Sequence, residues 1–315
     1  MNVIKREIKT AVITGPTGVI GQALCRYLLR KEIKVYTVCR PNSERNTSLP
    51  CDKALQKVFC DISDIADLPE LIGDKADVFY HLAWTNTASS LRNNMMAQVD
   101  NIKATLEACH AAKQLGCSVF VGAGTQAEYG RVNGMLKPDT PCFPENGYGM
   151  AKLCAGQMSR IECNKLNIAH IWPRILSVYG PHDSQKTMII QAIKKMLAGE
   201  IPSLTLGEQI WDYLYEEDAA EALYRLAVFG QNGSVYPVGS GRAKPLREFL
   251  IMLRDAINTT IPLGLGDIPY GEKQVMHLEA DLTALRDDTG FIPKTNFEVG
   301  IRKTIEYCRR QEGLK

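Results

Sequence analysis

Short apolar runs alternate with segments of helical spacing through the first 175 residues of this 315-residue chain. The runs are KTAVITG, KVYTVCR, LQKVFCD, DVFYHLA, CSVFVGAG and IAHIWPRIL. Each predicts a strand that is buried on both faces, and the segments between them predict amphipathic helices. This alternation is typical of a parallel sheet with helices on both sides. We therefore expect an α/β fold with a doubly wound parallel sheet.

A glycine-rich turn, VITGPTGVIG, follows the first predicted strand. Gly15 allows the tight turn, Gly18 lets a pyrophosphate approach the backbone, and Gly21 lets the next helix pack closely. Free N–H groups at the helix start would bind the diphosphate. The position in an alternating chain favours a Rossmann-type dinucleotide site over an ordinary strand-to-helix turn. Three neighbours are expected in the same site: Thr17, Val19 and Ile20.

The alternation becomes less regular after residue 175, and no Pro/Gly-rich linker divides the chain. We expect a dinucleotide-binding Rossmann domain in residues 1–175, with parts of 207–240. Residues 176–206 and 241–315 are expected to form mainly a smaller, mixed α/β substrate-binding lobe. The two lobes would therefore be interleaved in sequence.

The end of the second predicted strand distinguishes NADP from NAD. A carboxylate there would bind the ribose hydroxyls of NAD, but this chain has Arg40, with Ser43 and Arg45 close behind. A guanidinium can bind a 2′-phosphate through two hydrogen bonds, whereas a carboxylate would repel it. We expect NADP(H) to be preferred, with NAD(H) as the alternative. A solvated surface arginine is the competing interpretation of Arg40.

The segments after the third and fourth predicted strands would flank the adenine and the pyrophosphate. The residues concerned are Asp61, Ile62, Leu82, Ala83 and Trp84. Asp61 fits a helix cap equally well, and the neighbouring His81 fits a buried core histidine.

Tyr148 and Lys152 lie four residues apart in NGYGMAK, a predicted helix, and therefore on one face. A fixed ammonium group lowers the pKa of a nearby phenol from its ordinary value of about 10. The phenol can then exchange a proton with a carbinol oxygen while hydride moves to or from nicotinamide. This spacing is common by chance, but here it follows a dinucleotide turn and Thr125, which ends a predicted strand.

Taken together, the motifs resemble the extended short-chain dehydrogenase/reductase family, also called the NAD-dependent epimerase/dehydratase family. They are TGPTGVIG, HLAW, Asn101, TQAEYG, YGMAK, RILSVYGP and WDYLYEEDAAEAL, and they cover nearly the whole chain. The resemblance implies NAD(P) on the Rossmann sheet and a nucleotide sugar in the smaller lobe. It also implies that Thr125 hydrogen-bonds the reacting oxygen, Tyr148 transfers the proton, and Lys152 holds the nicotinamide ribose and tunes Tyr148. Further cofactor contacts are expected from Asn101, which would support Lys152, and from Pro173 and Ile175.

The residues after Thr125 indicate which reaction of the family the site can catalyse. In the 4,6-dehydratases that this chain resembles, an Asp and a Glu follow the Thr and eliminate water. Gln126 and Ala127 stand here instead, and they cannot serve as acid and base. The resemblance then favours NADPH-dependent reduction of a nucleoside-diphosphate-linked 4-keto-(deoxy)sugar at C4, as in deoxyhexose reductases of polysaccharide assembly. C4 epimerisation with tightly bound NAD is the alternative, and a non-catalytic cofactor-binding member is a third reading.

Five residues are expected to contact the substrate: Thr85, Gln126, Ser177, Trp211 and Arg242. Ser177 and Trp211 depart from the family, which has Asn before YGP and an Arg that contacts the diphosphate. Trp211 can stack on a base or pack in the core. Glu128, three residues beyond Thr125 along an extended chain, would point to the opposite side and is interpreted as structural.

Composition limits the other classes of function. The net charge of +2 and the lack of a dense basic cluster argue against nucleic-acid binding. The chain has neither an apolar leader nor a run of about 18 apolar residues, so we expect a cytoplasmic protein without a membrane partner. Ten scattered cysteines suit buried thiols in a reducing compartment, and no metal site is expected. The resemblance also implies a homodimer, with a seam formed by NNMMAQVDNIKATLEACHAAK and YGMAKLCAGQMSRIECNKL. The Met and Cys content of these helices fits core packing against the sheet equally well.

Overall fold

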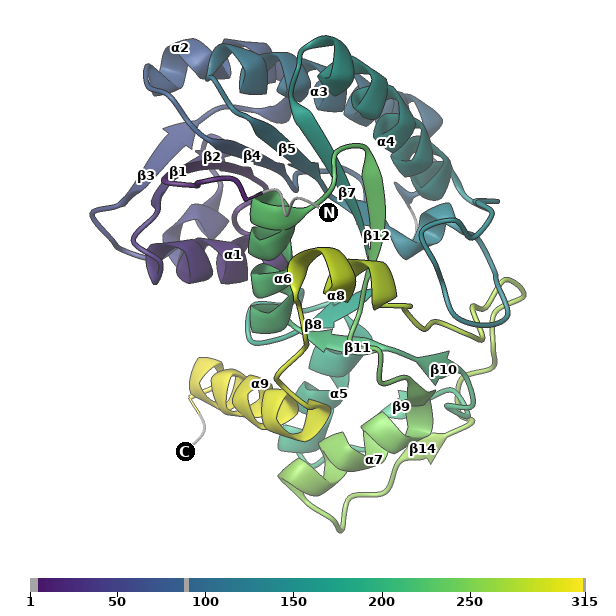
Figure 1. The fold of residues 1–315 in the computed structure, drawn as a ribbon. Helices are drawn as coiled ribbons and strands as arrows, with labels where there is room; N and C mark the ends of the chain where they lie inside the picture. The colour runs from purple at the N-terminus through teal and green to yellow at the C-terminus, as the bar shows by residue number, and fades with distance from the viewer. Residues whose placement is uncertain (1–4, 88–90, 314–315) are drawn as a thin grey trace.

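A parallel sheet forms the centre of the larger lobe in the computed structural model, which describes residues 5–87 and 91–313 (Figure 1). Its strands are β1 (Thr10–Thr14), β2 (Lys34–Cys39), β3 (Leu55–Phe59), β4 (Val78–His81), β5 (Val119–Gly122), β6 (Gly124–Thr125), β7 (Ala169–Ile175) and β12 (Ser234–Val238). The order is β12-β7-β5-β4-β1-β2-β3, and β6 pairs with β7. Every pair in this sheet is parallel.

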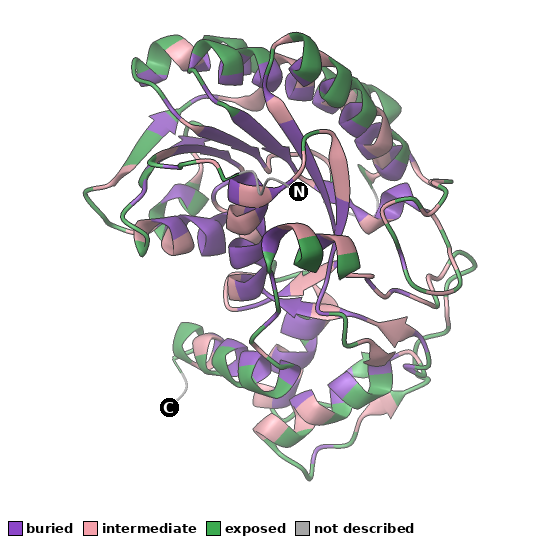
Figure 2. Ribbon diagram, viewed as in Figure 1, coloured by how far each residue is buried: buried purple, intermediate pink, exposed green. Residues whose placement is uncertain are grey.

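Helices cover both faces of the sheet. One face carries α1 (Val19–Leu29) and α6 (Glu216–Phe229), and the other carries α2 (Leu68–Ile72), α3 (Met95–Gln114) and α4 (Gly147–Lys165). Alternate residues of β1 serve the two sides: Ala11 and Ile13 join the core under α1 and α6, whereas Val12 joins the core under α3. The central strands are therefore buried throughout (Figure 2). The predicted doubly wound, Rossmann-type α/β fold is confirmed.

The smaller lobe packs three amphipathic helices around a cluster of aromatic rings, which includes Tyr179, Phe249 and Phe297. Its elements are β8 (Ser177–Tyr179), α5 (Met188–Leu197), β9 (Ser203–Leu204), β10 (Ile210–Trp211), β11 (Tyr213–Tyr215), β13 (Lys244–Pro245), α7 (Leu246–Ile257), β14 (Gly264–Leu265) and α9 (Phe297–Gln311). The strands form two-stranded sheets, β8 with β11, β9 with β14 and β10 with β13. A short helix, α8 (Thr283–Thr289), packs against α6.

The chain crosses between the lobes more than once. After β11 it returns to the main sheet, where α6 packs on α1 and β12 pairs with β7. It then leaves again to form β13 and α7. Short 3₁₀ helices lie on the connections of the larger lobe, among them η1 (Glu44–Ser48), η2 (Ile62–Asp67) and η4 (Gln126–Glu128). Among the described helices, none is long and apolar enough to cross a membrane.

Candidate active site

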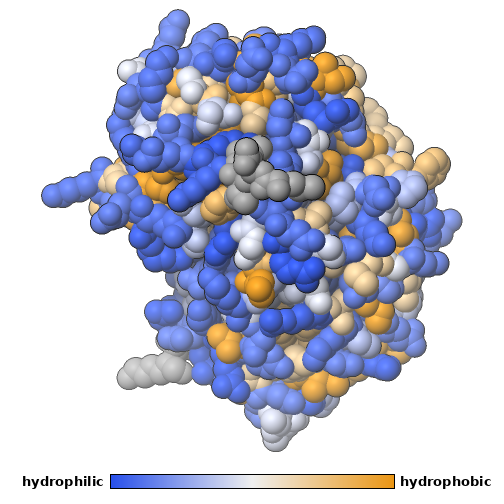
Figure 3. Space-filling view, in the orientation of Figure 1, coloured by the Kyte–Doolittle hydropathy of each residue, from blue (hydrophilic) through white to orange (hydrophobic). Residues whose placement is uncertain are grey.

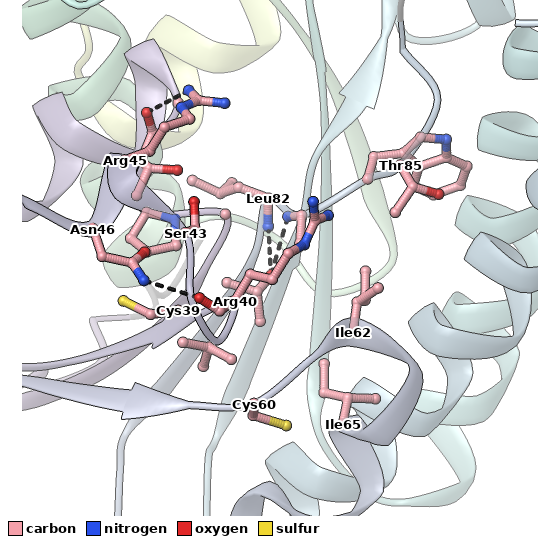
Figure 4. A pocket seen from close by; sticks show the side chains of 18 residues that line it. Cys39, Arg40, Ser43, Arg45, Asn46, Cys60, Ile62, Ile65, Leu82 and Thr85 are labelled. Atoms are coloured by element: carbon pink, nitrogen blue, oxygen red, sulfur yellow. Dashed lines mark hydrogen bonds between the residues drawn. The ribbon is translucent and has the colours of Figure 1, made fainter. Parts of the chain in front are cut away.

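A cavity of about 250 Å³ opens where β1, β2 and β4 end (Figure 4). Such an edge, at the carboxyl ends of parallel strands, is where open α/β sheets bind ligands. The lining residues are Thr14, Gly15, Pro16, Thr17, Gly18, Val38, Cys39, Arg40, Ser43, Arg45, Asn46, Cys60, Ile62, Ile65, Leu82, Ala83, Trp84 and Thr85.

The glycine turn forms one wall of this first cavity. Gly15 adopts φ +66°, and a Cβ there would lie 2.8 Å from the Ala83 nitrogen, so the position admits only glycine. A Cβ on Gly18 would meet nothing nearer than 3.7 Å, which leaves the backbone open on that side. Gly18 also caps the N-terminus of α1 without a side-chain hydrogen bond. The first N–H groups of α1 are therefore free to bind a diphosphate.

Arg40 extends across the cavity from the end of β2 (Figure 4). Its side chain is 66% exposed and lies 3.6 Å from the Asp61 carboxylate. Asp61 also accepts a hydrogen bond from the Ser63 backbone and so caps η2. Arg45 donates to the Thr17 carbonyl at 2.7 Å, which fixes it beside the glycine turn. Two guanidinium groups thus line this cavity, one from the end of β2 and one beside the glycine turn. The Asp61 carboxylate is both a helix cap and the ion-pair partner of Arg40.

The segment after β4 is tied to β1 and to α3. The Thr14 hydroxyl accepts hydrogen bonds from the Leu82 and Ala83 backbones, both at 3.1 Å. Asn101 on α3 accepts from the Thr85 backbone at 2.9 Å. The neighbouring His81 is buried and bonded through both ring nitrogens, to Thr14 and Thr105. Burial lowers the pKa of His81 to about 3, so it is a neutral core histidine.

A second cavity, of about 590 Å³, adjoins the first and shares Leu82 and Trp84 with it. It contains Thr125, Tyr148 and Lys152 together. The other residues that line it are Ile20, Thr87, Arg92, Ala123, Gly124, Gln126, Ile175, Leu176, Ser177, Trp211, Lys273, Gln274 and Val275. No acidic side chain is among these described lining residues.

Helix α4 carries Tyr148 and Lys152 into this cavity. Asn146 caps the helix by accepting from the Gly149 backbone, so Tyr148 lies in the first turn. Lys152, one turn later, is 3% exposed. Its Nζ donates to the Ala123 carbonyl at 2.6 Å and lies 3.9 Å from the centre of the Trp84 ring. The end of β5 and the indole of Trp84 therefore hold the ammonium group.

The two titratable groups of α4 are shifted mainly by burial. Burial raises the pKa of Tyr148, and the hydrogen bond with Thr125 and the charge of Arg92 lower it in part. Burial lowers the pKa of Lys152 to about 7, against a smaller opposing effect of Glu128. The sequence led us to expect Lys152 to tune Tyr148. The cation that lies over the Tyr148 ring is Arg92, whose guanidinium carbon is 5.1 Å from the ring centre.

Glu128 lies behind Thr125 and closes the 3₁₀ turn η4. Its Oε1 accepts from the Thr125 backbone at 2.8 Å, and its Oε2 accepts from Arg174 Nε at 2.7 Å. Trp172 donates to the same carboxylate. The turn makes the chain fold back, whereas we had expected an extended segment that points Glu128 to the opposite side. Its carboxylate is nevertheless fully buried and occupied by structural partners.

Comparison with known proteins identifies the family. Residues 11–239 match the model of the NAD dependent epimerase/dehydratase family. The chain belongs to this family. The match confirms the resemblance to extended short-chain dehydrogenases/reductases, a family of enzymes.

Individual members of the epimerase/dehydratase family align with nearly the whole chain. A dTDP-glucose 4,6-dehydratase of Neisseria gonorrhoeae is 24% identical over 95% of both sequences. The structure of the UDP-N-acetylglucosamine 4-epimerase from Methanobrevibacter ruminantium, in complex with UDP-N-acetylmuramic acid, has a TM-score of 0.87 and 22% identity, covering 97% of this chain and 100% of that one. The UDP-glucuronic acid 4-epimerase of Bacillus cereus, in complex with NAD, has a TM-score of 0.82 and 21% identity, covering 96% and 99%.

Most residues predicted for this family's site line one of the two cavities. Those at the first cavity are Gly15, Thr17, Gly18, Arg40, Ile62, Leu82, Ala83, Trp84 and Thr85. Those at the second are Ile20, Leu82, Trp84, Thr125, Gln126, Tyr148, Lys152, Ile175, Ser177 and Trp211. Thr85 therefore lies at the first cavity, although we expected it at the substrate.

Several predicted residues lie outside both linings. Val19 begins α1, Asp61 caps η2, and Asn101 holds the Thr85 segment. The support of Lys152 by Asn101 stays a prediction. Pro173 is buried within β7. Arg242 donates to the Pro293 carbonyl at 3.2 Å and does not line the second cavity, so the structure does not bring it to the site.

Other residues of the second cavity were missed from the sequence. They are Thr87, Arg92, Ala123, Gly124, Leu176, Lys273, Gln274 and Val275. Arg92 and Lys273 are the cations of this group, and both come from connections without a periodic pattern. A search for basic residues in the segment between HLAW and the Asn101 helix would have found Arg92. Among the described residues, no cluster of His, Cys, Asp or Glu is arranged to hold a metal ion.

Proposed function

We propose that this protein catalyses the NADPH-dependent reduction of a nucleoside-diphosphate-linked 4-keto-(deoxy)sugar at C4. The observation that carries the proposal is the position of Gln126 and Ala127 directly after Thr125. Gln126 lines the second cavity beside the triad, and Ala127 is buried. Neither can give or take a proton as a carboxyl group does. Chemistry at this site is therefore limited to hydride and one proton.

The surroundings support this reading. Elimination of water needs an acid and a base besides Tyr148, but the described lining of the second cavity offers no acidic side chain. Glu128, the nearest carboxylate in the sequence, is bonded to Arg174, Trp172 and the Thr125 backbone. The relative from Neisseria gonorrhoeae, at 24% identity, is a dehydratase. The reaction that we propose for this chain is a reduction instead.

The residues fit a dinucleotide across the two cavities. The open face of Gly18 and the N-terminus of α1 suit its diphosphate, and the adjoining second cavity suits its nicotinamide. The bound cofactor would supply hydride to C4 of the sugar. Tyr148 would then give its proton to the C4 oxygen, Thr125 would donate a hydrogen bond to the same oxygen, and Lys152 would orient the nicotinamide ribose.

For the cofactor we propose NADP(H), with NAD(H) as the alternative. Arg40 and Arg45 both line the first cavity at the end of β2, where they can pair with a 2′-phosphate. The Asp61 carboxylate is 3.6 Å from Arg40 and would compete for that charge. The solved relative from Bacillus cereus contains NAD, so the proposed preference rests on this chain's own residues.

A C4 epimerase is the second candidate. Epimerisation needs the same triad and, like the reduction, needs no further acid or base. In that case the site would hold NAD tightly as a reversible hydride acceptor, and the configuration at C4 would be inverted. An epimerase interconverts two sugar nucleotides without net consumption of cofactor, so the two candidates differ in stoichiometry.

We also propose that residues 1–175, with parts of 207–240, bind the cofactor, and that 176–206 and 241–315 form most of the substrate lobe. Ser177 and Trp211, from β8 and β10, support this division because both line the second cavity opposite α4. Gln126 would contact the sugar from the larger lobe.

The test is a panel of CDP-, dTDP-, GDP- and UDP-linked 4-keto sugars with NADPH or NADH, analysed by mass spectrometry. We expect NADPH oxidation and a product heavier by two hydrogens, both lost in Tyr148→Phe. Purified protein that carries NAD and interconverts epimers would instead support the second candidate. No oxidation with any member of the panel would overturn the reductase.

A further inference from the structure

Arg92 makes a contact with Tyr148 that the proposed triad does not include. Its guanidinium carbon lies 5.1 Å from the centre of the Tyr148 ring. Trp84 meets the same ring edge-on, with 6.2 Å between the ring centres. A cation over an aromatic face is attracted by the ring's quadrupole, and the attraction increases when the ring gains negative charge.

The backbone holds Arg92 against the helix that carries Tyr148. The neighbouring Asn93 side chain accepts from the Gly147 backbone at 2.9 Å, in the first turn of α4. A Cβ on Gly147 would lie only 2.9 Å from the Arg92 carbonyl oxygen, so the two backbones are in close contact. The Arg92 Nε donates to the Thr87 carbonyl at 3.0 Å. These anchors fix the guanidinium over the phenol ring.

The other charges around Tyr148 are engaged elsewhere or come from the smaller lobe. Lys152, on the same helix, donates to Ala123 and lies on the Trp84 ring. Glu128, behind Thr125, is paired with Arg174. Lys273 lines the cavity from the smaller lobe. Within the described ranges, Arg92 has no carboxylate at salt-bridge distance, so its charge is available to the phenol.

We propose that Arg92 is a positioning residue for Tyr148, and that its charge stabilises the phenolate formed when Tyr148 protonates the substrate. The inference rests on the proposed role of Tyr148 as proton donor. In that step the Tyr148 O–H bond breaks and an O–H bond forms at the C4 oxygen, which holds the electron pair released when hydride reaches C4. Tyr148 then recovers a proton from solvent. Arg92 lowers the cost of the intermediate charge without giving up a proton itself.

The electrostatics of Tyr148 agree with this role. Burial raises the pKa of Tyr148, and the hydrogen bond with Thr125 and then the charge of Arg92 oppose this rise. Loss of the charge at position 92 should therefore make the phenol a weaker acid.

A titration that needs no turnover tests the inference. With 3,5-difluorotyrosine incorporated at position 148, ¹⁹F NMR reports the ionisation of this phenol at a pH where the protein is folded. The titration midpoint should rise by about one pH unit in Arg92→Met. Arg92→Lys should restore most of the difference, and Arg302→Met, which removes an exposed charge on α9, should leave the midpoint unchanged.

An unchanged midpoint in folded Arg92→Met would overturn the proposal. So would an Arg92→Lys midpoint as high as that of Arg92→Met, because the effect would then come from shape and not from charge. The pH profile of kcat/KM with an active ketosugar should shift in the same direction. If no ketosugar is reduced, the proposed reaction fails, yet the NMR titration still decides the role of Arg92.

Discussion

The buried ammonium group of Lys152 lowers the free energy of unfolding by an amount that depends on pH. Burial lowers its pKa in the folded protein from 10.5 to about 7. Between these two values the unfolded chain binds the proton more fully than the folded one, so the free energy of unfolding should rise with pH. The destabilisation is complete below about pH 7 and is lost as pH rises toward the unfolded value.

The prediction is measured by denaturation of ligand-free protein between pH 7 and 9. Wild-type stability should gain at most about 1.4 kcal/mol per pH unit relative to Lys152→Met. Comparing the two proteins removes the contributions of other groups, such as the buried cysteines, whose raised pKa values act at higher pH. Parallel pH dependences in the two proteins would show that Lys152 is not charged and buried as described.

The Glu128–Arg174 ion pair gives a second prediction at this scale. Both side chains are buried, and their N···O distance is 2.7 Å. Glu128→Gln should lower the free energy of unfolding by about 3–5 kcal/mol, because Arg174 is left with an unpaired buried charge. In urea denaturation, Glu128→Gln combined with Arg174→Met should recover a substantial part of this loss. A double variant as unstable as the sum of the single variants would contradict the coupling.

Side-chain contacts explain where prediction from the sequence succeeded and failed at the level of residues. The spacing of Tyr148 and Lys152 was sufficient because one helix presents both. Arg242 was expected at the substrate because it is charged, but its guanidinium donates a hydrogen bond to the Pro293 carbonyl. Arg92 was missed because its position depends on contacts with the first turn of α4, which the local sequence does not encode.

At the scale of elements, the packing of α4 on the sheet depends on the Trp172 indole of β7. Gly156 of α4 and Gly122 of β5 both lie directly against this ring. A Cβ on Gly156 would be 2.6 Å from the ring, which is closer than packed atoms tolerate. The small residues thus let the helix that carries Tyr148 lie close to the strands.

Gly156→Ala should therefore destabilise the protein by about 1–3 kcal/mol, because the extra methyl group forces α4 away from β7. The midpoint of chemical denaturation measures the effect. Gly271→Ala is the matched control, since a Cβ there has no neighbour within 4 Å. Gly156→Ala should destabilise the Trp172→Leu protein less than it destabilises the wild-type protein, because the smaller side chain leaves room for the methyl group. Equal stability of Gly156→Ala and Gly271→Ala would refute this account.

At the scale of the whole molecule, cofactor binding tests the proposed preference for NADP. A ligand that binds only the folded state raises stability by about 2.7 kcal/mol at 100 times its Kd. We expect NADPH to raise Tm more than NADH at equal concentration. Arg40→Glu should weaken NADPH binding about tenfold or more, because a carboxylate replaces a phosphate partner. A larger Tm increase with NADH in the wild-type protein would contradict the preference.

We propose that the chain forms the homodimer expected from the sequence, because apolar side chains are exposed at the expected seam. Exposed apolar side chains gather on the outer faces of α3 and α4, which pack against each other: Met95, Met96, Val99, Met150, Met158 and Ile161. In Figure 3, apolar side chains also gather along the upper right edge, where Figure 1 places α4. Sedimentation should give twice the mass of the chain, and Met96→Glu with Ile161→Glu should give a monomer. A monomeric wild-type protein would rule this surface out as a dimer seam.

The central strands of the sheet were predictable because they are continuous apolar runs, which parallel strands buried on both faces need. The edge strand β3 differs from the predicted burial on both faces, since most of its residues are exposed. The smaller lobe was less predictable from the sequence. Its strands, such as Ser203–Leu204 and Ile210–Trp211, are only two residues long, and they pair across large sequence separations. Their partners, β14 and β13, are set by the packing of α5, α7 and α9 and not by a local pattern.

The late return of β12 to the sheet has a consequence for synthesis of the protein. β7 ends at Ile175, and its outer neighbour β12 begins at Ser234, 59 residues later (234 − 175). At about 5–20 residues per second, a ribosome needs several seconds to make that interval. Until then the growing chain presents β7 as an unpaired edge, which can pair with other chains. Slower translation of 176–238 would therefore lengthen the time for which this edge is open to other chains.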